Sequence, residues 1–533
     1  MSRTTVIVPA SIFGLLLGLG APALAQNQTD TLSPLVDRGV PFRLRIEPVR
    51  WDGDPLPAIH SAAHAMEGER VLFVGGKTSG LHNFDCDPDE NFPAKDFNGS
   101  LMVVDLATRE TFTRSLNEAG SGLTAAQIAA LSSINTLSEE SDGRLISVGG
   151  YGIDENGDYV TFSSLRVIDV AGAIDWVLGD ATLLSDHVRF HGPPSGAPSD
   201  FFTICGGILI KNGEEFWSCL GHDFQGGYTE CGPIGTTQVY TKSIRRFSLD
   251  QTRADTPPIF IGETADPPSW ARRRDLNVLP AMVPGGLGAV ALGGVFTLDD
   301  GVWTTPIVVA PDGGMTMRDP DARAALRQGF NVYDSARLSF WSASRGENWF
   351  VAFGGLGYQV LADGQLVENA SIPYSNEVLA VRYVPDSDRW SQHLIGASFP
   401  TTTDSAGNVY HHGTETFTFP LVDRDDHQID LDALTEETAI AYIYGGIVAG
   451  GQGVVNFPAT FASNQMFQIV FEPGPGCPAD FDASGAVDAA DLASILATWG
   501  RVADGTPEDL NADRVVNSAD LGGLIAAWGL CSN

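Results

Sequence analysis

Alternating apolar and polar residues recur along most of the chain and predict short β-strands. In "FRLRIEP" (42–48), apolar residues occupy one face of an extended chain and charged residues the other. Turn pairs such as Asn212-Gly213 separate segments of this kind and favour β-hairpins. The segment "LTAAQIAALSS" (123–133) has the spacing of a helix and interrupts the pattern. Residues 42–472 are therefore predicted to form a mainly β body.

One local pattern recurs six times in this body: an apolar strand, a glycine pair, a loop and another strand. "RVLFVGGKTSG" (70–80) and "WFVAFGGLGYQ" (349–359) are two copies, and the copy "FWSCLGHDF" (216–224) has one glycine in place of two. The mean interval between marker glycines is 74 residues. The marker glycines are Gly75, Gly149, Gly221, Gly293, Gly354 and Gly445. A repeat of this length with several short strands is typical of a propeller or a solenoid.

The strand and glycine-pair signature resembles the blades of kelch-type β-propellers over residues 42–472. The resemblance implies about six blades around a central channel. Five or seven blades stay open, because "GNVYHHG" (407–413) also reads as a strand, and a pair of β-sandwiches is the alternative fold. "FRLRIEP" and "MFQIVFEP" (466–473), at opposite ends of the body, are predicted to share one blade.

Two acidic segments follow the body, "DFDASGAVDAADLASILATWG" (480–500) and "DLNADRVVNSADLGGLIAAWG" (509–529). Oxygen-bearing side chains fall at positions 1, 3, 5, 9 and 12 of each loop, with a backbone carbonyl at position 7, which is the spacing of calcium ligands in an EF-hand. Crowded carboxylates repel unless a cation lies among them, so two calcium sites are predicted. The predicted ligands are Asp480, Asp482, Ser484, Ala486, Asp488 and Asp491 in the first loop, and Asp509, Asn511, Asp513, Val515, Asn517 and Asp520 in the second.

Both loops end in Asp at position 12 and lead directly into one helix each. Residues 480–531 therefore resemble the type I dockerin module, which implies two bound Ca²⁺ ions, a small all-α domain (480–533) and a cohesin-like or cell-surface protein as partner. The second loop departs from this pattern, because Arg514 stands at position 6 where the first loop has Gly485. Positions 10 and 11 also lack the Ser-Thr pair that many dockerins use to contact cohesin. The resemblance supports calcium binding better than cohesin recognition.

Apolar residues in each predicted helix recur at i, i+3, i+4 and i+7, and we expect the two stripes to pack against each other. The stripes are Leu492, Ile495, Leu496 and Trp499 in the first helix, and Leu521, Leu524, Ile525 and Trp528 in the second. The Pro- and Gly-rich stretch 473–479 is the predicted linker to the body.

The start of the chain has the pattern of a secretory signal peptide, predicted to span residues 1–25. A basic Arg3 precedes an apolar stretch and the small-residue pattern Ala23-Leu24-Ala25. The protein is therefore expected to be secreted and extracellular, and no other segment is long and apolar enough to predict a membrane span. The net charge of −35 argues against nucleic acid as a partner.

Six cysteines in an exported protein favour disulfides. Cys477 and Cys531 bracket the acidic loops and are predicted to pair. Cys205 and Cys219 flank the hairpin turn at Asn212-Gly213 and are expected to face each other on neighbouring strands. Cys86 and Cys231 then form the third predicted pair by elimination, and free buried thiols are the alternative.

The sequence leaves open whether the body is catalytic. In one hypothesis the propeller binds a glycan or a protein while the tail docks; in the other it is a polysaccharide-degrading enzyme, a glycoside hydrolase or a lyase, delivered by its tail. His60 and His64 precede a marker strand, and Arg272 to Arg274 are clustered in a chain poor in cations, so a shared site for an acidic polysaccharide is one expectation. Structural hydrogen bonding is the other, since three consecutive residues of a strand cannot all face one site.

Overall fold

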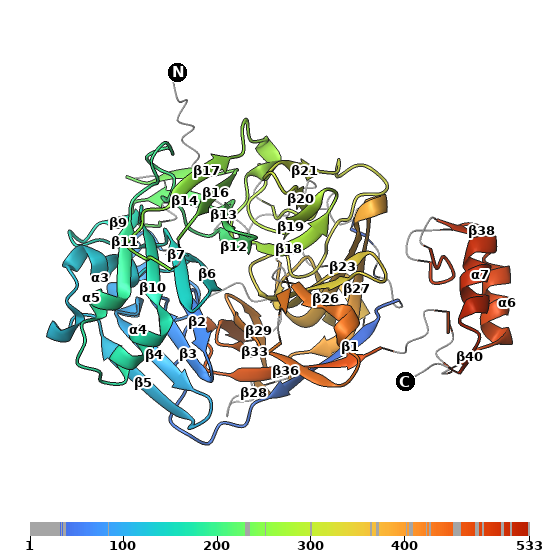
Figure 1. Ribbon diagram of the computed structural model, residues 1–533, viewed down its shortest axis with the longest axis horizontal. Coiled ribbons are helices and arrows are strands. Elements are labelled where there is room, and N and C mark those ends of the chain that lie inside the picture. The colour runs from blue at the N-terminus through green and yellow to red at the C-terminus, as the bar shows by residue number, and fades with distance from the viewer. Residues whose placement is uncertain are drawn as a thin grey trace.

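The computed structural model is mainly β, as predicted, and is built from many small sheets (Figure 1). It describes residues 32–33, 35, 39–83, 85–229, 235–250, 252–298, 301–362, 365–368, 372–400, 402–403, 409–422, 424–425, 428–450, 460–474, 479–481, 484, 486–502, 506–511 and 514–530. The predicted signal peptide and most of the predicted linker lie outside these residues. None of the helices in the described segments is long and apolar enough to cross a membrane.

Six sheets, each with a core of four antiparallel strands, contain most of the body. The first sheet contains β2 (Ala63–Glu67), β3 (Arg70–Val74), β4 (Ser100–Asp105) and β5 (Glu110–Ser115). The second contains β6 (Leu137–Ser141), β7 (Arg144–Val148), β10 (Leu165–Asp169) and β11 (Val188–His191). The third contains β12 (Ile208–Asn212), β13 (Glu215–Cys219), β16 (Ile244–Ser248) and β17 (Ile259–Glu263).

The other three sheets also have four core strands. The fifth has two additional strands, and the sixth includes one strand from the start of the body. The fourth contains β18 (Asn277–Val283), β19 (Gly286–Leu292), β20 (Ile307–Val309) and β21 (Met315–Met317). The fifth contains β22 (Ala336–Ser342), β23 (Glu347–Leu356), β26 (Tyr374–Val384) and β27 (Arg389–Ser398), extended beside β22 by β32 (Gln428–Asp430) and β31 (Arg424–Asp425). The sixth contains β30 (Phe417–Pro420), β33 (Thr438–Tyr444), β36 (Met466–Pro473) and β1 (Phe42–Pro48).

The first strands of the six sheets contact one another in the order β2, β6, β12, β18, β22 and β30, and β30 also contacts β2. Each of the six sheets therefore has one sheet on either side of it, and the first strands lie toward the middle of the body (Figure 1). Such an arrangement of many four-stranded units differs from the alternative of paired β-sandwiches, in which large sheets face each other.

The marker glycines occupy backbone conformations that a side chain disfavours. In each copy the first marker residue has φ between 60° and 69°, and the second has φ between 84° and 111°. In the third copy Leu220 takes the first position with φ 60°, and Gly221 the second with φ 87°. The sequence alignment that treated Gly221 as the counterpart of Gly75 was therefore wrong by one residue. Glycine recurs here because it adopts positive φ without a steric cost.

Hydrogen bonds from the marker residues connect five of the six copies to the next copy. The backbone N–H of Gly150 donates to the Ile204 carbonyl at 2.8 Å, immediately upstream of the third sheet. In the last copy Gly446 donates to the carbonyl of Ile59 at 3.0 Å, upstream of the first sheet. The same contact is made by Gly76 to Ser133, Gly221 to Arg273 and Gly294 to Val332. The repeat signature thus marks contacts between sheets as well as a turn within one.

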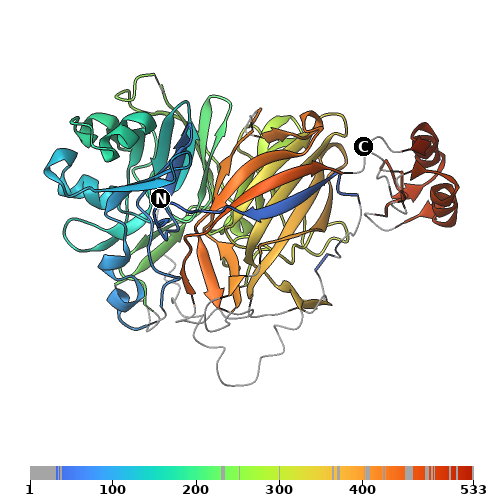
Figure 2. The same cartoon turned by 90° about the horizontal axis from the view of Figure 1, so that it is seen from below.

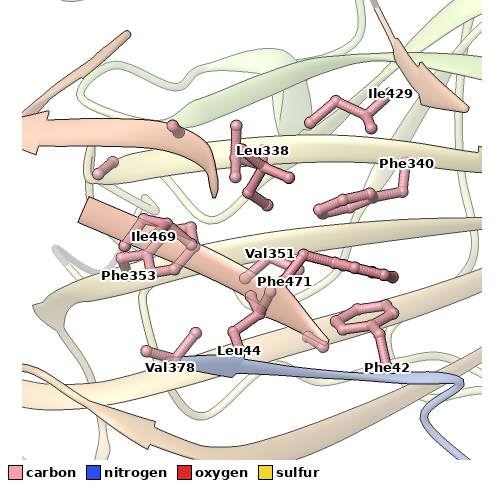
Figure 3. Packing of buried hydrophobic residues seen from close by; sticks show 14 of the residues in the cluster. Phe42, Leu44, Leu338, Phe340, Val351, Phe353, Val378, Ile429, Ile469 and Phe471 are labelled. Carbon is pink, nitrogen blue, oxygen red and sulfur yellow. The ribbon is translucent and has the colours of Figure 1, made fainter. Parts of the chain in front are cut away.

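The predicted pairing of the two ends of the body is confirmed. β1 pairs antiparallel with β36 over residues 42–48 and 467–473. Phe42 and Leu44 are buried, and with Phe471 they join the largest hydrophobic cluster, which extends into the fifth sheet (Figure 3). The apolar face predicted by the alternation of 42–48 is therefore the face that packs.

The strand predicted at 407–413 belongs to a small accessory sheet and not to a seventh unit. β29 (Val409–Thr414) pairs with β28 (Thr402–Thr403) and β34 (Ile447–Gly450), and β34 pairs with β35 (Thr460–Ala462). Three accessory hairpins are β8 (Tyr151–Ile153) with β9 (Tyr159–Thr161), β14 (His222–Gln225) with β15 (Thr237–Tyr240), and β24 (Gln359–Ala362) with β25 (Gln365–Glu368).

The predicted helix at 123–133 is confirmed as α3 (Ala125–Leu131), whose capping box joins Thr124 and Gln127. Three further short helices were not predicted, because segments of four to eight residues are too short to show a clear helical period. They are α2 (Pro88–Asn91), α4 (Val170–Val177) and α5 (Leu184–His187).

The C-terminal segment lies beside the body at one end of the long axis (Figure 2). Its helices are α6 (Ala489–Ala497) and α7 (Ser518–Ala526). Two pairs of two-residue strands accompany them, so the described part is not purely helical: β37 (Ala486–Val487) pairs with β40 (Gly529–Leu530), and β38 (Gly500–Arg501) pairs with β39 (Val515–Val516). The segment has its own small cluster of buried apolar residues.

The prediction that the two apolar helical stripes pack against each other is only partly confirmed. Ile495 and Leu524 are fully buried, and Leu492 and Leu521 pack against them. The outer members of each stripe stay in solvent. The side chains of Leu496, Trp499, Ile525 and Trp528 are 49% to 59% exposed.

The predicted disulfide between Cys205 and Cys219 is wrong. The hairpin forms, but its register places Cys219 opposite Ile208, while Cys205 pairs with His222 in a separate bridge. Both thiols are free and buried. Cys86 is disulfide-bonded. Cys231, Cys477 and Cys531 lie outside the described residues, so the other two predicted pairings stay predictions.

Burial should make both free thiols unreactive in the folded protein. It raises the pKa of Cys205 to about 12 and also raises the pKa of Cys219, so neither forms a thiolate at neutral pH. We expect no reaction of these two with a thiol-specific disulfide reagent in buffer and full reaction in denaturant. Rapid labelling of either cysteine in the native protein, located by peptide mass mapping, would contradict their placement.

Candidate functional site

The first acidic loop is organised around the buried carboxylate of Asp491. This side chain is 0% exposed, and its two oxygens accept the backbone N–H groups of Phe481 at 2.5 Å and Asp488 at 2.9 Å. Asp480, at position 1, accepts the N–H of Ser484 at 3.0 Å. These bonds fold the loop back on itself, so that positions 1, 5, 9 and 12 approach one another.

The second loop repeats this arrangement. Asp520 is 0% exposed and accepts the N–H groups of Asn511 at 3.2 Å and Asn517 at 2.8 Å. Asp509, at position 1, accepts the N–H of Arg514 at 2.6 Å. In both loops the aspartate at position 12 accepts the N–H of position 9, and the aspartate at position 1 accepts a backbone N–H from the middle of its own loop. The two loops therefore have similar geometries, although their other donors differ by one position.

Position 9 of each loop also begins the helix that follows. The side chains of Asp488 and Asn517 accept the N–H groups of Ala490 and Ala519, and each forms a capping box with the aspartate at position 12. The carbonyl-bearing residues at position 7, Ala486 and Val515, lie in β37 and β39.

Asp482 and Asp513, at positions 3 and 5 of their respective loops, lie outside the described residues. In the part of the chain that the structure describes, no three side chains of the His, Cys, Asp or Glu type form a group that could hold a metal ion. The donor set that is described still fits a hard cation, because it consists of carboxylate, hydroxyl, amide and carbonyl oxygens.

Two arginines distinguish the second loop from the first. Arg514, at position 6, has φ 67°, which is the left-handed conformation that glycine adopts most easily. Arg389, at the start of β27, donates to the Asn511 carbonyl at 3.0 Å, and its guanidinium lies 3.9 Å from the Asp509 carboxylate. Backbone strain at position 6 and the nearby positive charge of Arg389 are both expected to weaken calcium binding at the second loop.

We expect Arg514→Gly to tighten calcium binding at the second loop about fivefold, since relief of left-handed strain contributes about 1 kcal/mol. The comparison is made by calorimetric calcium titration in an Asp491→Asn background, which leaves only the second loop intact. Arg501→Gly, at an exposed arginine of the same segment, is the matched control. Equal affinities for the two glycine variants would contradict the strain argument.

A cavity of about 490 Å³ occupies the middle of the body and is lined by residues on or next to the first strands of all six sheets. Its walls are mixed: Leu209, Leu279 and Leu338 are apolar, whereas Ser138 and Thr418 carry hydroxyl groups. The charged or ionisable residues in its lining are His64, Glu139, Glu140, Asp275, Asp334, Arg337 and Glu415. Carboxylates therefore outnumber guanidinium groups, and the cavity disfavours polyanions.

Six equivalent residues surround one end of this cavity, each two positions before the first strand of its sheet. Five of them have φ between 49° and 61°, and Asp334 is the exception. Backbone bonds join neighbours around the ring, such as Asn135 N–H to the Ser61 carbonyl and Glu415 N–H to the Asp334 carbonyl. The six are Ser61, Asn135, Gly206, Asp275, Asp334 and Glu415, called here the mouth ring.

Sequence reasoning did not find the mouth ring. A signal was present, because Ser61, Asn135 and Gly206 each precede the first marker position by 14 residues. That spacing fails in later copies, where longer loops intervene, and the side chains themselves differ from copy to copy. Only the fold brings three acidic members of the ring side by side.

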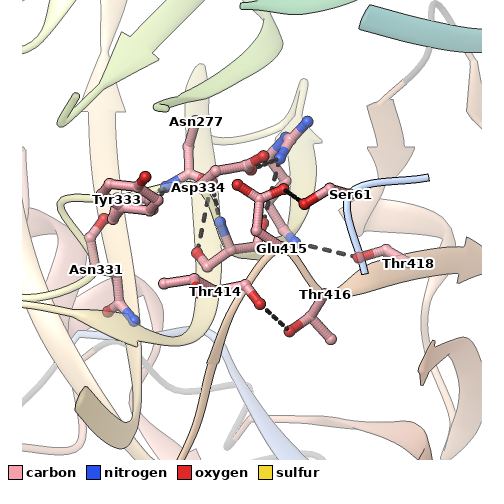
Figure 4. Close-up of polar contacts among 11 residues, drawn as sticks. Ser61, Asn277, Asn331, Tyr333, Asp334, Thr414, Glu415, Thr416 and Thr418 are labelled. Carbon is pink, nitrogen blue, oxygen red and sulfur yellow. Dashed lines mark hydrogen bonds and ion pairs between the residues drawn. The ribbon is translucent and has the colours of Figure 1, made fainter. Parts of the chain in front are cut away.

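The acidic members of the mouth ring have different partners, and Figure 4 shows two of these members, Asp334 and Glu415. Asp275 forms an ion pair with Arg274, and Asp334 forms one with Arg337 at 2.5 Å. Glu415 instead contacts the Ser61 hydroxyl at 2.9 Å. Burial raises the pKa of Glu415 well above its ordinary value, and the nearby Asp334 and Asp275 carboxylates raise it further.

The other candidate residues of the body are dispersed. Arg273 is fully buried and donates to the carbonyls of Gly293 and Thr305, whereas Arg272 lies over the ring of Tyr240. The three arginines therefore do not share a site, and the expectation of an arginine cluster for acidic polysaccharides is wrong. His64 lines the cavity, while His60 lies behind the mouth ring.

Comparisons with known proteins do not assign a family. No protein-family model matches the chain, and no curated protein matches it. Among solved structures, one titled "Structure of YjhT" aligns with 79% of this chain and 99% of its own, at 11% sequence identity and a TM-score of 0.39. Its fold likeness is too weak to carry an argument about this protein.

Proposed function

We propose that the body is a six-bladed, kelch-like β-propeller whose central cavity binds a glycan. Support for the propeller comes from the order of contacts among the first strands, including that between β30 and β2. The bond from Gly446 to Ile59 supports it as well, since it joins the last copy of the repeat to the first. Pairing of β1 with β36 would complete the sixth blade with a strand from each end of the body.

The observation that carries the binding function is the cavity itself. Its volume of about 490 Å³ suits a small ligand or the end of a chain, and it is too small for a folded protein domain. Carboxyl and hydroxyl groups on apolar walls suit the hydroxyl groups and the C–H faces of a sugar. The acidic lining favours neutral glycans over acidic ones.

We propose that the C-terminal segment is a dockerin-like module that binds two Ca²⁺ ions. Asp480, Asp491, Asp509 and Asp520 would supply carboxylates, assisted by the other predicted ligands of each loop. Bound calcium would neutralise carboxylates that the fold brings together, and so would stabilise both loops.

The module would mediate docking or surface association outside the cell. Support comes from equivalent exposed apolar pairs, Leu496 with Trp499 on α6 and Ile525 with Trp528 on α7. Large apolar side chains exposed on a small domain are typical of protein contact sites. A cohesin-like or other cell-surface protein is the partner class that the dockerin resemblance implies.

The glycan proposal is tested by calorimetry of the full chain with neutral and uronic-acid oligosaccharides. We expect a neutral oligosaccharide to bind, and Ser138→Tyr, which fills the cavity, to weaken binding at least about tenfold. Ser195→Tyr, at an exposed position, is the matched control. Binding that survives Ser138→Tyr, or a preference for uronic acids, would contradict the proposed site.

A polysaccharide-degrading enzyme is the second candidate, and one observation favours it. Asp334 and Glu415 are neighbours in one cavity, beside Arg337, and they have different partners. Two carboxyl groups in different environments are the usual acid and base of glycoside hydrolysis. Release of new reducing ends from a neutral polysaccharide, lost in Asp334→Asn, would favour this candidate over binding alone.

A further inference from the structure

A chain of hydrogen bonds runs from the protein interior to the mouth ring. The carbonyl of Ser79 lies 2.9 Å from Nε2 of His60, and Nδ1 of His60 lies 2.7 Å from the Ser61 hydroxyl. That hydroxyl lies 2.9 Å from Oε2 of Glu415. His60 is only 3% exposed, so the chain ends in the interior on one side and in the cavity on the other.

The protons in this chain can be assigned one by one. Burial and the nearby Lys77 ammonium lower the pKa of His60 to about 3, so the imidazole is neutral and carries one N–H. A carbonyl oxygen only accepts, so that N–H is on Nε2, and Nδ1 is an acceptor. Ser61 then gives its single hydrogen to Nδ1. The contact between Ser61 and Glu415 therefore needs a proton from Glu415.

Two of the three charged groups around Glu415 also favour its protonated form. Asp334 and Asp275, from the two preceding sheets, disfavour a third negative charge at the mouth ring, and Arg337 favours it. Arg337 is already ion-paired with Asp334, and Arg274 with Asp275. Of the three acidic residues in the ring, Glu415 is the one whose side chain contacts a neutral hydroxyl group instead of an arginine.

We infer that Glu415 is a neutral carboxylic acid at neutral pH and sets the ligand specificity of the cavity. Glu415 donates its proton in a hydrogen bond to the Ser61 oxygen, which leaves Oε1 as a carbonyl-type acceptor for a ligand hydroxyl. Without its charge, this residue favours neutral hydroxyl-bearing ligands over amines and other cations. The ligand class rests on the proposed glycan function, whereas the protonation state does not.

The protonation state is tested by infrared difference spectroscopy of the full chain at pH 7. Subtracting the spectrum of Glu415→Gln from that of the natural protein should leave the C=O band of a protonated carboxylic acid. The same subtraction with Glu139→Gln, at another carboxyl group of the cavity lining, is the matched control. A carboxylate band for Glu415 would overturn the inference.

The pH dependence of stability gives an independent test. Because folding raises the pKa of Glu415, the folded state holds a proton that the unfolded state has lost, and the free energy of unfolding falls as the pH rises from the ordinary Glu value to the folded one. Glutamine mimics the protonated acid, since its amide donates to Ser61. Glu415→Gln should therefore match the natural protein at the acid end of this range and exceed it at the alkaline end, whereas parallel curves would overturn the inference.

Ligand binding separates this inference from the proposed function. If a neutral tetrasaccharide binds at pH 7, Glu415→Gln should change its affinity less than about twofold, because one neutral group replaces another. A larger loss would show that an ionised carboxylate is required. Failure of every glycan to bind, with the acid band present, would refute the glycan function and leave the protonated Glu415 established.

Discussion

We expect the substitution Gly149→Ala to destabilise the β body by at least about 3 kcal/mol. A Cβ atom on this residue would lie 1.8 Å from the Ile204 carbonyl oxygen, which is far inside van der Waals contact. The same carbonyl accepts the N–H of Gly150, so it cannot move away without losing a bond between two copies of the repeat. The loss is measured by denaturant unfolding of the full chain.

The control for this prediction is Gly157→Ala. Gly157 also has positive φ, at 90°, but no atom lies within 4 Å of the position of an added Cβ. It therefore carries only backbone strain, about 1 kcal/mol. If the two alanine variants lose the same stability, the contact between copies of the repeat is not what requires glycine at position 149.

We expect Asp491→Asn and Asp520→Asn each to lower the local stability of the C-terminal helices by about 2.7 kcal/mol at free calcium a hundredfold above the dissociation constant. The substitution keeps the side-chain volume and removes the charge of a buried ligand candidate. Hydrogen exchange of α6 and α7 amides measures the effect without interference from the body.

Chelator supplies the control for the aspartate variants. Once calcium is removed, the natural protein loses the same stabilisation, so each variant and the natural protein should exchange at similar rates. If the loss of local stability stays the same in chelator, it comes from the hydrogen bonds that these aspartates accept from backbone N–H groups. Calcium would then have no part in their effect.

The sequence predicted the structural features that depend on residues close together in the chain. Alternation in 42–48 predicted both the strand and its buried face, and the glycine pairs marked five of the six copies of the repeat. The apolar spacing after each acidic loop predicted the helices α6 and α7. Each of these features follows from backbone geometry over a few residues.

The sequence did not predict which residues of different strands and different copies of the repeat lie opposite each other. The pairing predicted for Cys205 and Cys219 failed because the hairpin register places Ile208 opposite Cys219. Leu220 was misread because the glycine preference of its backbone position is overcome by burial of its side chain in the core. The mouth ring was missed because its acidic residues come from three copies of the repeat with loops of different lengths.

The central claim of this account is that calcium binds within the two acidic loops. Its most direct test is native mass spectrometry of the full chain, stripped with chelator and then exposed to calcium. The account predicts two bound ions in the natural protein, one in Asp491→Asn and one in Asp520→Asn. The same number of ions in the natural protein and in both variants, or no ions in any of them, would contradict it.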